Sequence, residues 1–311
     1  MKRIGLDVGG HTITAGVVDF SRSPAKLLRA ETVAAPSPRA AEPLVEAAAA
    51  LVMRFAESGE ECFAGMGLPG FVAKDRKTVA RLTNYENCDG LALGAAVERR
   101  LAERGIRAKA AIENDANCAA LGEATAGAGK NVKNMLMVTL GTGVGGGIII
   151  DGKLYTGCNS LAGELGHIVI RQGGEPCGCG RRGCLEAYSS AAALVKFAHR
   201  ALDAGRESSL RENGPALNAK HICDAVDAGD ALACELFETY CDDLACGLSS
   251  FINIFQPECI VLGGGLAGYG EKLLAPLRRR IEKETFRGDT NTELVLASLG
   301  NDAGLVGAAM L

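Results

Sequence analysis

The chain has 311 residues, of which 48% are hydrophobic and 23% charged, a composition ordinary for a folded globular protein. A net charge of −4 argues against a general nucleic-acid binder. Apolar runs such as residues 145–150 are far too short to cross a bilayer. Charged residues close to the N-terminus leave no secretory leader, so the 12 cysteines predict a reducing compartment rather than a disulfide framework. We therefore expect a cytoplasmic protein with neither a nucleic-acid nor a membrane partner.

The first part of the chain alternates strand and helix patterns. An apolar run over residues 3–8 predicts a buried strand, and Gly9 and Gly10 predict a turn into a returning strand over 12–19. The patterns that follow predict a helix over 40–57, a strand over 62–68, a helix over 91–104, a strand ending at 112 and a helix from Asn114 to about 127. Strands alternating with crossover helices indicate an α/β fold.

The second part begins with the same pattern as the first. A strand over 135–140, a glycine-rich turn over 141–147 and a strand over 148–151 repeat the order seen near residue 9, which suggests two similar lobes. Helices are then expected over 191–205, 219–228 and 231–255. A strand over 258–262 leads into three glycines and a helix reaching about 283, and a closing helix is expected over 302–311.

One imidazole and three thiols lie within a short, glycine-rich segment. His167, Cys177, Cys179 and Cys184 can close a tetrahedral Cys₃His site, the geometry that structural zinc prefers. The alternative is a set of buried or free cysteines, but the other cysteines are scattered singly. Four protein ligands leave no open position, so the metal would organise a loop rather than catalyse. Glu164 and Glu186 flank this loop, and they either bind hydroxyl groups of a polar ligand or are ordinary solvated charges.

The glycine-rich turns favour a nucleotide without matching a standard dinucleotide motif. Gly141, Gly143 and Gly146 fit the Rossmann spacing, but a strand follows them where that motif needs a helix, and no P-loop Gly-Lys-Ser/Thr is present. Backbone amides in tight turns can bind phosphate, and Asp7 before the first turn could hold the hydration shell of Mg²⁺. Plain turn chemistry is the alternative for any single turn.

Asn114 and Asp115 have two interpretations of equal weight. Either residue is a good N-cap for the helix that follows. Alternatively, Asp115 is a general base at the edge of a binding site. Spacing alone does not choose between them.

Together these motifs resemble the ROK family of sugar kinases and repressors, with the match running nearly end to end. It is carried by residues 7–10, 67–70, 113–117, 140–147, 263–265 and the metal loop 164–186. The resemblance implies a two-lobed, actin-like (ribonuclease-H-like) α/β fold with a cleft between the lobes. The first lobe would comprise residues 1–115, closed by a helix over 300–311. The second, residues 116–299, would carry the zinc loop and a dimer surface.

The family's residue roles carry over by position. The resemblance implies Asp115 as the base that takes the proton from the sugar hydroxyl, with one nitrogen of His167 on zinc and the other on sugar. The remaining sugar contacts would be Gly70, Asn84, Asn114, Glu164 and Glu186. The residues implied for nucleotide binding are Asp7, Gly9, Gly10, His11, Thr12, Gly141, Thr142, Gly143, Gly263, Gly264 and Gly265.

The implied activity is ATP-dependent phosphorylation of a hexose, at the 6-hydroxyl, with Mg²⁺ and a structural Zn²⁺ in a homodimer. Two positions depart from the family pattern: His11 replaces the usual threonine and Thr14 a common lysine. The chain has no tryptophan, although many family glucokinases have one, so the sugar could be glucose, a related hexose or an N-acetylhexosamine. A non-catalytic, sugar-sensing regulator is the alternative. Such regulators carry an N-terminal helix-turn-helix, for which a strand starting at residue 3 leaves no room.

Overall fold

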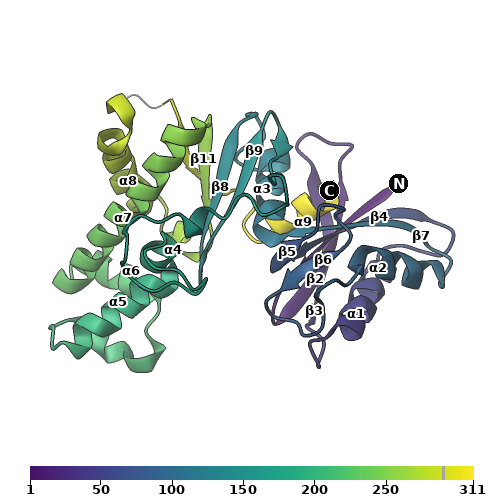
Figure 1. Ribbon diagram of the computed structural model, residues 1–311, viewed down its shortest axis with the longest axis horizontal. Coiled ribbons are helices and arrows are strands. Elements are labelled where there is room, and N and C mark those ends of the chain that lie inside the picture. The colour runs from purple at the N-terminus through teal and green to yellow at the C-terminus, as the bar shows by residue number, and fades with distance from the viewer. Residues whose placement is uncertain (289–290) are drawn as a thin grey trace. The chain divides into compact units, whose positions relative to one another are not determined.

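The computed structural model describes residues 1–288 and 291–311 (Figure 1). Its first sheet has the strand order β3-β2-β1-β4-β7, in which β1 runs antiparallel to β2 and parallel to β4. The strands are β1 (Lys2–Val8), β2 (Thr12–Asp19), β3 (Lys26–Ala34), β4 (Glu61–Leu68) and β7 (Arg107–Asn114). A separate two-stranded ribbon joins β5 (Gly70–Val72) to β6 (Val79–Leu82). The predicted site residue Asp7 lies near the end of β1, and Asp115 directly follows β7.

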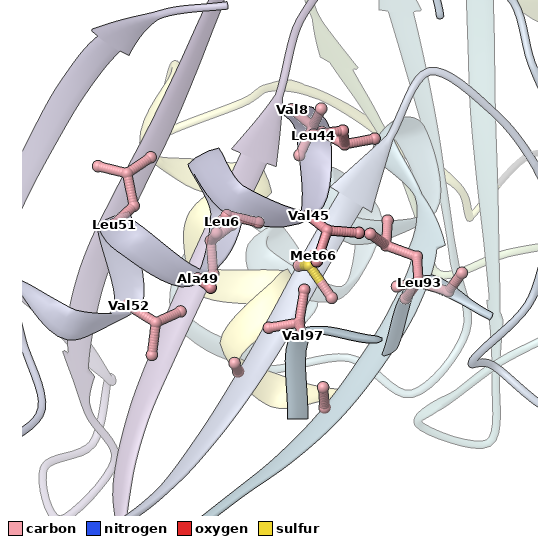
Figure 2. Packing of buried hydrophobic residues seen from close by; sticks show 14 of the residues in the cluster. Leu6, Val8, Leu44, Val45, Ala49, Leu51, Val52, Met66, Leu93 and Val97 are labelled. Carbon is pink, nitrogen blue, oxygen red and sulfur yellow. The ribbon is translucent and has the colours of Figure 1, made fainter. Parts of the chain in front are cut away.

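Two helices bury an apolar face of this sheet. They are α1 (Ala41–Met53) and α2 (Leu93–Ala102), and side chains from both meet side chains from β1 and β4 in one core. Figure 2 shows Leu6 and Met66 of the strands among Val45 of α1 and Val97 of α2. Burying one such aliphatic side chain contributes about 1.5–3 kcal/mol, so this layer stabilises the sheet beneath the predicted site.

The C-terminal helix packs against the other elements of the first part through glycines. It is α9 (Asp302–Met310), and its neighbour α3 spans Asp115–Ala126. A Cβ atom on Gly65 of β4 would lie 1.7 Å from the carbonyl oxygen of Ala308, and one on Gly307 would lie 1.7 Å from that of Cys118. Only glycine permits this approach of backbone to backbone. The chain end therefore seats α3, whose first residue is Asp115.

The second sheet repeats the strand order of the first. The order is β10-β9-β8-β11-β12, so in both sheets the third, second, first, fourth and fifth strands lie side by side. The strands are β8 (Met135–Leu140), β9 (Val144–Ile150), β10 (Lys153–Leu154), β11 (Cys259–Gly263) and β12 (Glu293–Leu296). The prediction of a repeated α/β arrangement is confirmed.

Three helices after residue 185 begin at residues whose polar side chains cap them. Ser190, Asn218 and Asp230 each accept a backbone N–H bond of the first turn, at the starts of α5 (Ala191–Asp203), α6 (Ala219–Asp227) and α7 (Ala231–Phe255). The short helix α4 spans Glu186–Ser189, and α8 spans Glu271–Glu284. Segments of 3₁₀ helix span Leu165–His167, Ser209–Ala216, Gly265–Tyr269 and Phe286–Gly288. The predicted helix starts at 191, 219 and 231 are confirmed.

Contacts group the chain into two compact units. One holds residues 1–137, 147–163 and 298–311, and the other holds residues 138–146 and 164–297. This division differs from the boundary expected after residue 115, because α3 packs against α9 and stays with the first unit. Within the described parts of the chain, no helix combines the length and apolar character needed to cross a bilayer.

Candidate active site

The first glycine turn is fixed by contacts within the first unit. The backbone N–H of Gly9 donates to the carbonyl of Thr12 (2.9 Å), and the hydroxyl of Tyr85 donates to the carbonyl of Gly9 (3.1 Å). Gly10 lies against the amide of Asn84, since a Cβ atom there would stand 3.0 Å from Asn84 Nδ2. The turn thus brings together two predicted sites, the phosphate turn and the sugar contact Asn84. His11 and Thr12 are exposed beside them.

Two carboxylates of this unit influence each other. Burial, and to a lesser extent the negative charge of Asp115, together raise the pKa of Asp7 to about 6. Burial also raises the pKa of Asp115, against the backbone N–H of Ala116 that stabilises its ionised form. Asp115 is nevertheless exposed to solvent. A carboxylate with a raised pKa is a better proton acceptor than an ordinary aspartate.

Asn114 is the N-cap of α3, as one of the two interpretations of the Asn114–Asp115 pair predicted. Its Oδ1 accepts from the backbone N–H groups of Ala116 (2.9 Å) and Asn117 (3.1 Å), and its Nδ2 donates to the carbonyl of Gly70 (3.1 Å). The cap therefore leaves Asp115 in the first helical position, and the Asn114 side chain links this helix start to Gly70. Asn114, Asp115 and Gly70, all predicted site residues, lie together.

A buried glutamate that the sequence did not single out holds this corner. Glu113 is 3% exposed, and its Oε1 accepts from the backbone N–H of Asn114 (2.9 Å) and from Asn117 Nδ2 (3.1 Å). Its Oε2 lies 3.4 Å from Arg76 Nε. The backbone of Arg76 accepts from the N–H of Ile112 (2.8 Å), which ties the turn after β5 to β7. This network fixes the residue that precedes Asp115.

In the second unit, the four predicted metal ligands converge. The donor atoms of His167, Cys177, Cys179 and Cys184 all lie within 4.8 Å of one another. The sulfur atoms of Cys179 and Cys184 are 3.7 Å apart, and Cys177 Sγ is 3.6 Å from His167 Nδ1. A tetrahedral zinc ion with Zn–S bonds of about 2.3 Å separates two thiolates by about 3.8 Å. The donor set and its spacing fit zinc.

The backbone of this loop is folded tightly by its glycines. Gly183 has a positive φ of 80°, and a Cβ atom on it would lie 1.7 Å from the carbonyl oxygen of Arg171. Isolated β-bridges join Val169 to Cys184 and Pro176 to Arg182. These contacts bring the two ends of the ligand set together without long-range elements.

Both glutamates that flank the loop contact other predicted site residues. Glu186 Oε2 accepts from the backbone N–H of Val144 (3.0 Å), in the second glycine loop, and its Oε1 lies 3.4 Å from Cys177 Sγ. Gly143 lies against this carboxylate, since a Cβ atom there would stand 2.4 Å from Glu186 Oε2. Glu164 Oε2 lies 3.8 Å from His167 Nε2. The metal cluster, both glutamates and the glycine loop therefore form one continuous site.

A pocket of about 760 Å³ adjoins the second glycine loop within the second unit. Gly141, Thr142 and Gly265 line it as the sequence predicted. Gly264 stands beside the pocket with a positive φ of 83° and packs against Leu140, while Gly263 ends the buried strand β11. Sequence reasoning missed the other lining residues, which include Asn218, Lys220, Cys223, Asp224, Asp227, Tyr269 and Lys272.

Three comparisons place the chain among known proteins. The sequence profile of the ROK family matches residues 3–311. A glucokinase of Thermotoga maritima is 33% identical over 315 residues, covering 100% of this chain and 97% of its own. An N-acetyl-D-glucosamine kinase of Vibrio vulnificus is 32% identical over 320 residues, covering 99% and 98%. The crystal structure of a ROK family glucokinase from Streptomyces griseus, in complex with glucose and AMPPNP, has a TM-score of 0.80 at 34% identity and covers 100% of this chain and 98% of its own.

The matches extend over both units and every motif described above. They confirm the predicted actin-like α/β fold, because sequence and structure agree over the same full length. The chain belongs to the ROK family.

Proposed function

We propose that the protein is an ATP-dependent hexose kinase that phosphorylates the 6-hydroxyl of its sugar. The observation that carries the proposal is Asp115, an accessible carboxylate with a raised pKa, fixed at the first position of α3 by the Asn114 cap. Full-length similarity to the glucokinase and the N-acetyl-D-glucosamine kinase named above supports the same reaction.

Asp115 would accept the proton of the attacking hydroxyl as the bond from its oxygen to the γ-phosphorus forms and the bond from that phosphorus to the β–γ bridging oxygen breaks, which releases ADP. Phosphoryl transfer needs little covalent participation by the protein, so positioning and charge stabilisation supply most of the rate enhancement. Asn84, Asn114, Glu164, His167 and Glu186 would bind the sugar hydroxyls, and Gly70 would shape that site through its contact with Asn114.

The glycine turns would hold the nucleotide. Backbone N–H groups of Gly9–Thr12 and Gly141–Gly143 would bind phosphates, and the 760 Å³ pocket beside Gly265 has room for adenosine. Asp7 would hold Mg²⁺ through its hydration shell, since a carboxyl with a pKa of about 6 is mostly ionised at neutral pH. Bound there, Mg²⁺ would neutralise charge on the phosphates.

Zinc would have a structural role. His167, Cys177, Cys179 and Cys184 would hold it as a closed four-ligand site. The ion would fix which nitrogen of His167 faces the sugar, and it would keep Glu164 and Glu186 on one ordered loop.

The decisive experiment is a panel of hexoses with ATP and Mg²⁺, in which ADP release is measured and sugars are ranked by kcat/KM. We expect turnover with glucose, a related hexose or an N-acetylhexosamine. The non-catalytic regulator would instead bind a sugar without releasing ADP above the rate without sugar.

We further propose a cytoplasmic homodimer with neither a nucleic-acid nor a membrane partner. The net charge of −4 supports the absence of a nucleic-acid partner. The cytoplasmic location rests on the cysteine pattern of the sequence, which is typical of a reducing compartment. The dimer rests on the resemblance to the family. Sedimentation equilibrium that gives the mass of one chain at micromolar concentration would overturn it.

A further inference from the structure

A second large pocket of the second unit lies outside the residues assigned above. It has a volume of about 700 Å³ and is lined by residues of the metal loop, α4, α5 and α7, and Figure 1 labels these three helices. Apolar and aromatic side chains form its floor, since Tyr188, Leu194 and Tyr240 are each at most 5% exposed. Four arginines also line it: Arg171, Arg182, Arg200 and Arg206.

The wall of this pocket is positively charged in a chain that is negative as a whole. Arg171 pairs with Asp243, Arg206 pairs with Glu235, and Glu175 is shared by Arg200 and Lys196. The residues that line the pocket include these four arginines and two carboxylates, those of Glu175 and Asp243, a net charge of +2, against −4 for the chain. Arginine guanidinium groups favour phosphate and carboxylate because they can donate two parallel hydrogen bonds.

Two aromatic rings lie beside these cations. Tyr188 and Phe197 stack with ring centroids 6.2 Å apart. Arg171 lies over the Tyr188 ring at 4.8 Å, and Arg200 lies over the Phe197 ring at 5.5 Å. The pocket therefore offers an aromatic surface next to anion-binding groups. That combination suits a small ligand with a ring and a phosphate.

The pocket is connected to the metal loop by short contacts. The backbone N–H of Glu175 donates to the hydroxyl of Tyr188 (2.6 Å), and the carbonyl of Glu175 accepts from the N–H of Gly183 (2.8 Å), next to Cys184. Tyr188 lies on α4 two residues after Glu186. Glu175 thus joins the cations of the pocket to the segment that carries the metal ligands and the proposed sugar ligand.

We propose that this pocket binds a small ring-bearing phosphate monoester and that binding there weakens sugar affinity. A bound phosphate competes with Glu175 for Arg200 and Lys196. Loss of those ion pairs releases the 173–176 segment, which loosens the loop holding Glu186 and His167. The coupling to sugar rests on the proposed function, whereas the phosphate site itself does not.

Calorimetry measures the binding of two probes, phenyl phosphate and inorganic phosphate. The protein is loaded with zinc, and saturating Mg-ADP occupies the proposed nucleotide site. Phenyl phosphate should bind about fivefold more tightly than inorganic phosphate, because stacking on an aromatic ring adds about 1 kcal/mol. Arg200→Gln should weaken phenyl phosphate binding about tenfold by removing a charged hydrogen-bond donor. Glu175→Gln should strengthen it, because it removes the competing carboxylate.

Arg279→Gln provides the matched control. Arg279 is an exposed arginine of α8 in the same unit, but it does not line the pocket, so its loss should leave phenyl phosphate binding unchanged. Equal loss of binding in Arg200→Gln and Arg279→Gln would overturn the site. Undetectable binding of phenyl phosphate to the unchanged protein would also overturn the site. A changed sedimentation coefficient in Arg200→Gln would then identify the pocket as a contact between copies of the chain.

The coupling is tested by binding alone, so it does not depend on turnover. Saturating phenyl phosphate should raise the sugar dissociation constant about fivefold, and saturating sugar should raise that of phenyl phosphate by the same factor. An unchanged sugar dissociation constant would refute the coupling. Phenyl phosphate binding without any sugar binding would instead refute the proposed function and leave the phosphate site in place.

Discussion

At the scale of single residues, Asp115 is the group on which catalysis should depend most. Asp115→Asn keeps the size of the side chain but removes the proton acceptor. We expect kcat to fall by about 10²–10⁴, the usual contribution of a positioned base, while the sugar dissociation constant changes little. Steady-state kinetics and calorimetry check the two halves of this prediction.

Asp302 offers a matched control for that substitution. It also follows an asparagine and also begins a helix of the first unit, α9. Asp302→Asn should therefore keep kcat within about twofold of the unchanged protein, as expected for a surface substitution. Equal losses in the two variants would mean that Asp115 acts through helix stability rather than as the base.

The pH dependence of the reaction should also reflect these carboxylates. The pKa of Asp7 is raised to about 6 and that of Asp115 is raised in the same direction. Because both groups act in their ionised forms, kcat/KM should be constant at neutral pH and should fall as the pH decreases through about 6. An ordinary aspartate would place this loss near pH 4. A profile of kcat/KM that stays flat down to pH 5 would contradict the assigned roles.

At the scale of elements, the start of α3 depends on the pair formed by Arg76 and Glu113. Arg76→Asn removes the guanidinium, and asparagine tolerates the left-handed backbone that Arg76 adopts, with a φ of 52°. It leaves the buried carboxylate of Glu113 without its cation, so the corner that fixes Asn114 should loosen. We expect kcat to fall about tenfold, with less effect on KM, because base alignment matters most in the transition state.

Lys77→Ala is the control for the Arg76 substitution. Lys77 neighbours Arg76 and forms an ion pair with Glu98 at 2.9 Å, with 46% of its side chain exposed. An exposed pair of this kind contributes little, so kcat should be nearly unchanged. If both variants lose activity alike, the turn as a whole matters and not the Glu113 carboxylate.

The metal loop should hold about one zinc per chain in the purified protein. Cys179→Ser should lower the zinc content and, because the 164–186 loop loses its organising ion, weaken sugar binding. Cys158→Ser is the control, since Cys158 is exposed and outside the cluster. Elemental analysis and calorimetry give the two readouts, and an active protein without metal would refute the zinc assignment.

The sequence pattern did not reveal β3. It is an edge strand whose residues are mostly exposed, so it has no clear alternation of apolar and polar residues. The metal site was predictable because all its ligands lie within one short segment and its glycines are visible in the sequence. The pair of Arg76 and Glu113 was not, because only the fold of the β5–β6 ribbon brings residue 76 to β7.

At the scale of the whole molecule, the glycine turns and the strand–helix pattern predicted a repeated α/β arrangement, and the resemblance to the ROK family implied the actin-like fold. Neither predicted the full lining of the nucleotide pocket. Gly141 and Thr142 were found from their motif. Lys220, Asp227 and Tyr269 belong to α6 and the 3₁₀ segment after β11, where no local pattern marks a binding residue. Such residues become visible only when distant segments of the chain meet.

Transfer of the γ-phosphoryl group of ATP to a hexose, with Asp115 as the base, can be followed directly. Radiolabelled γ-phosphate is traced into the sugar for the unchanged protein and for Asp115→Asn. We expect one hexose 6-phosphate for each ADP released, and a rate lower by about 10²–10⁴ in the variant. Release of labelled inorganic phosphate without sugar phosphate, or equal transfer rates in both proteins, would contradict it.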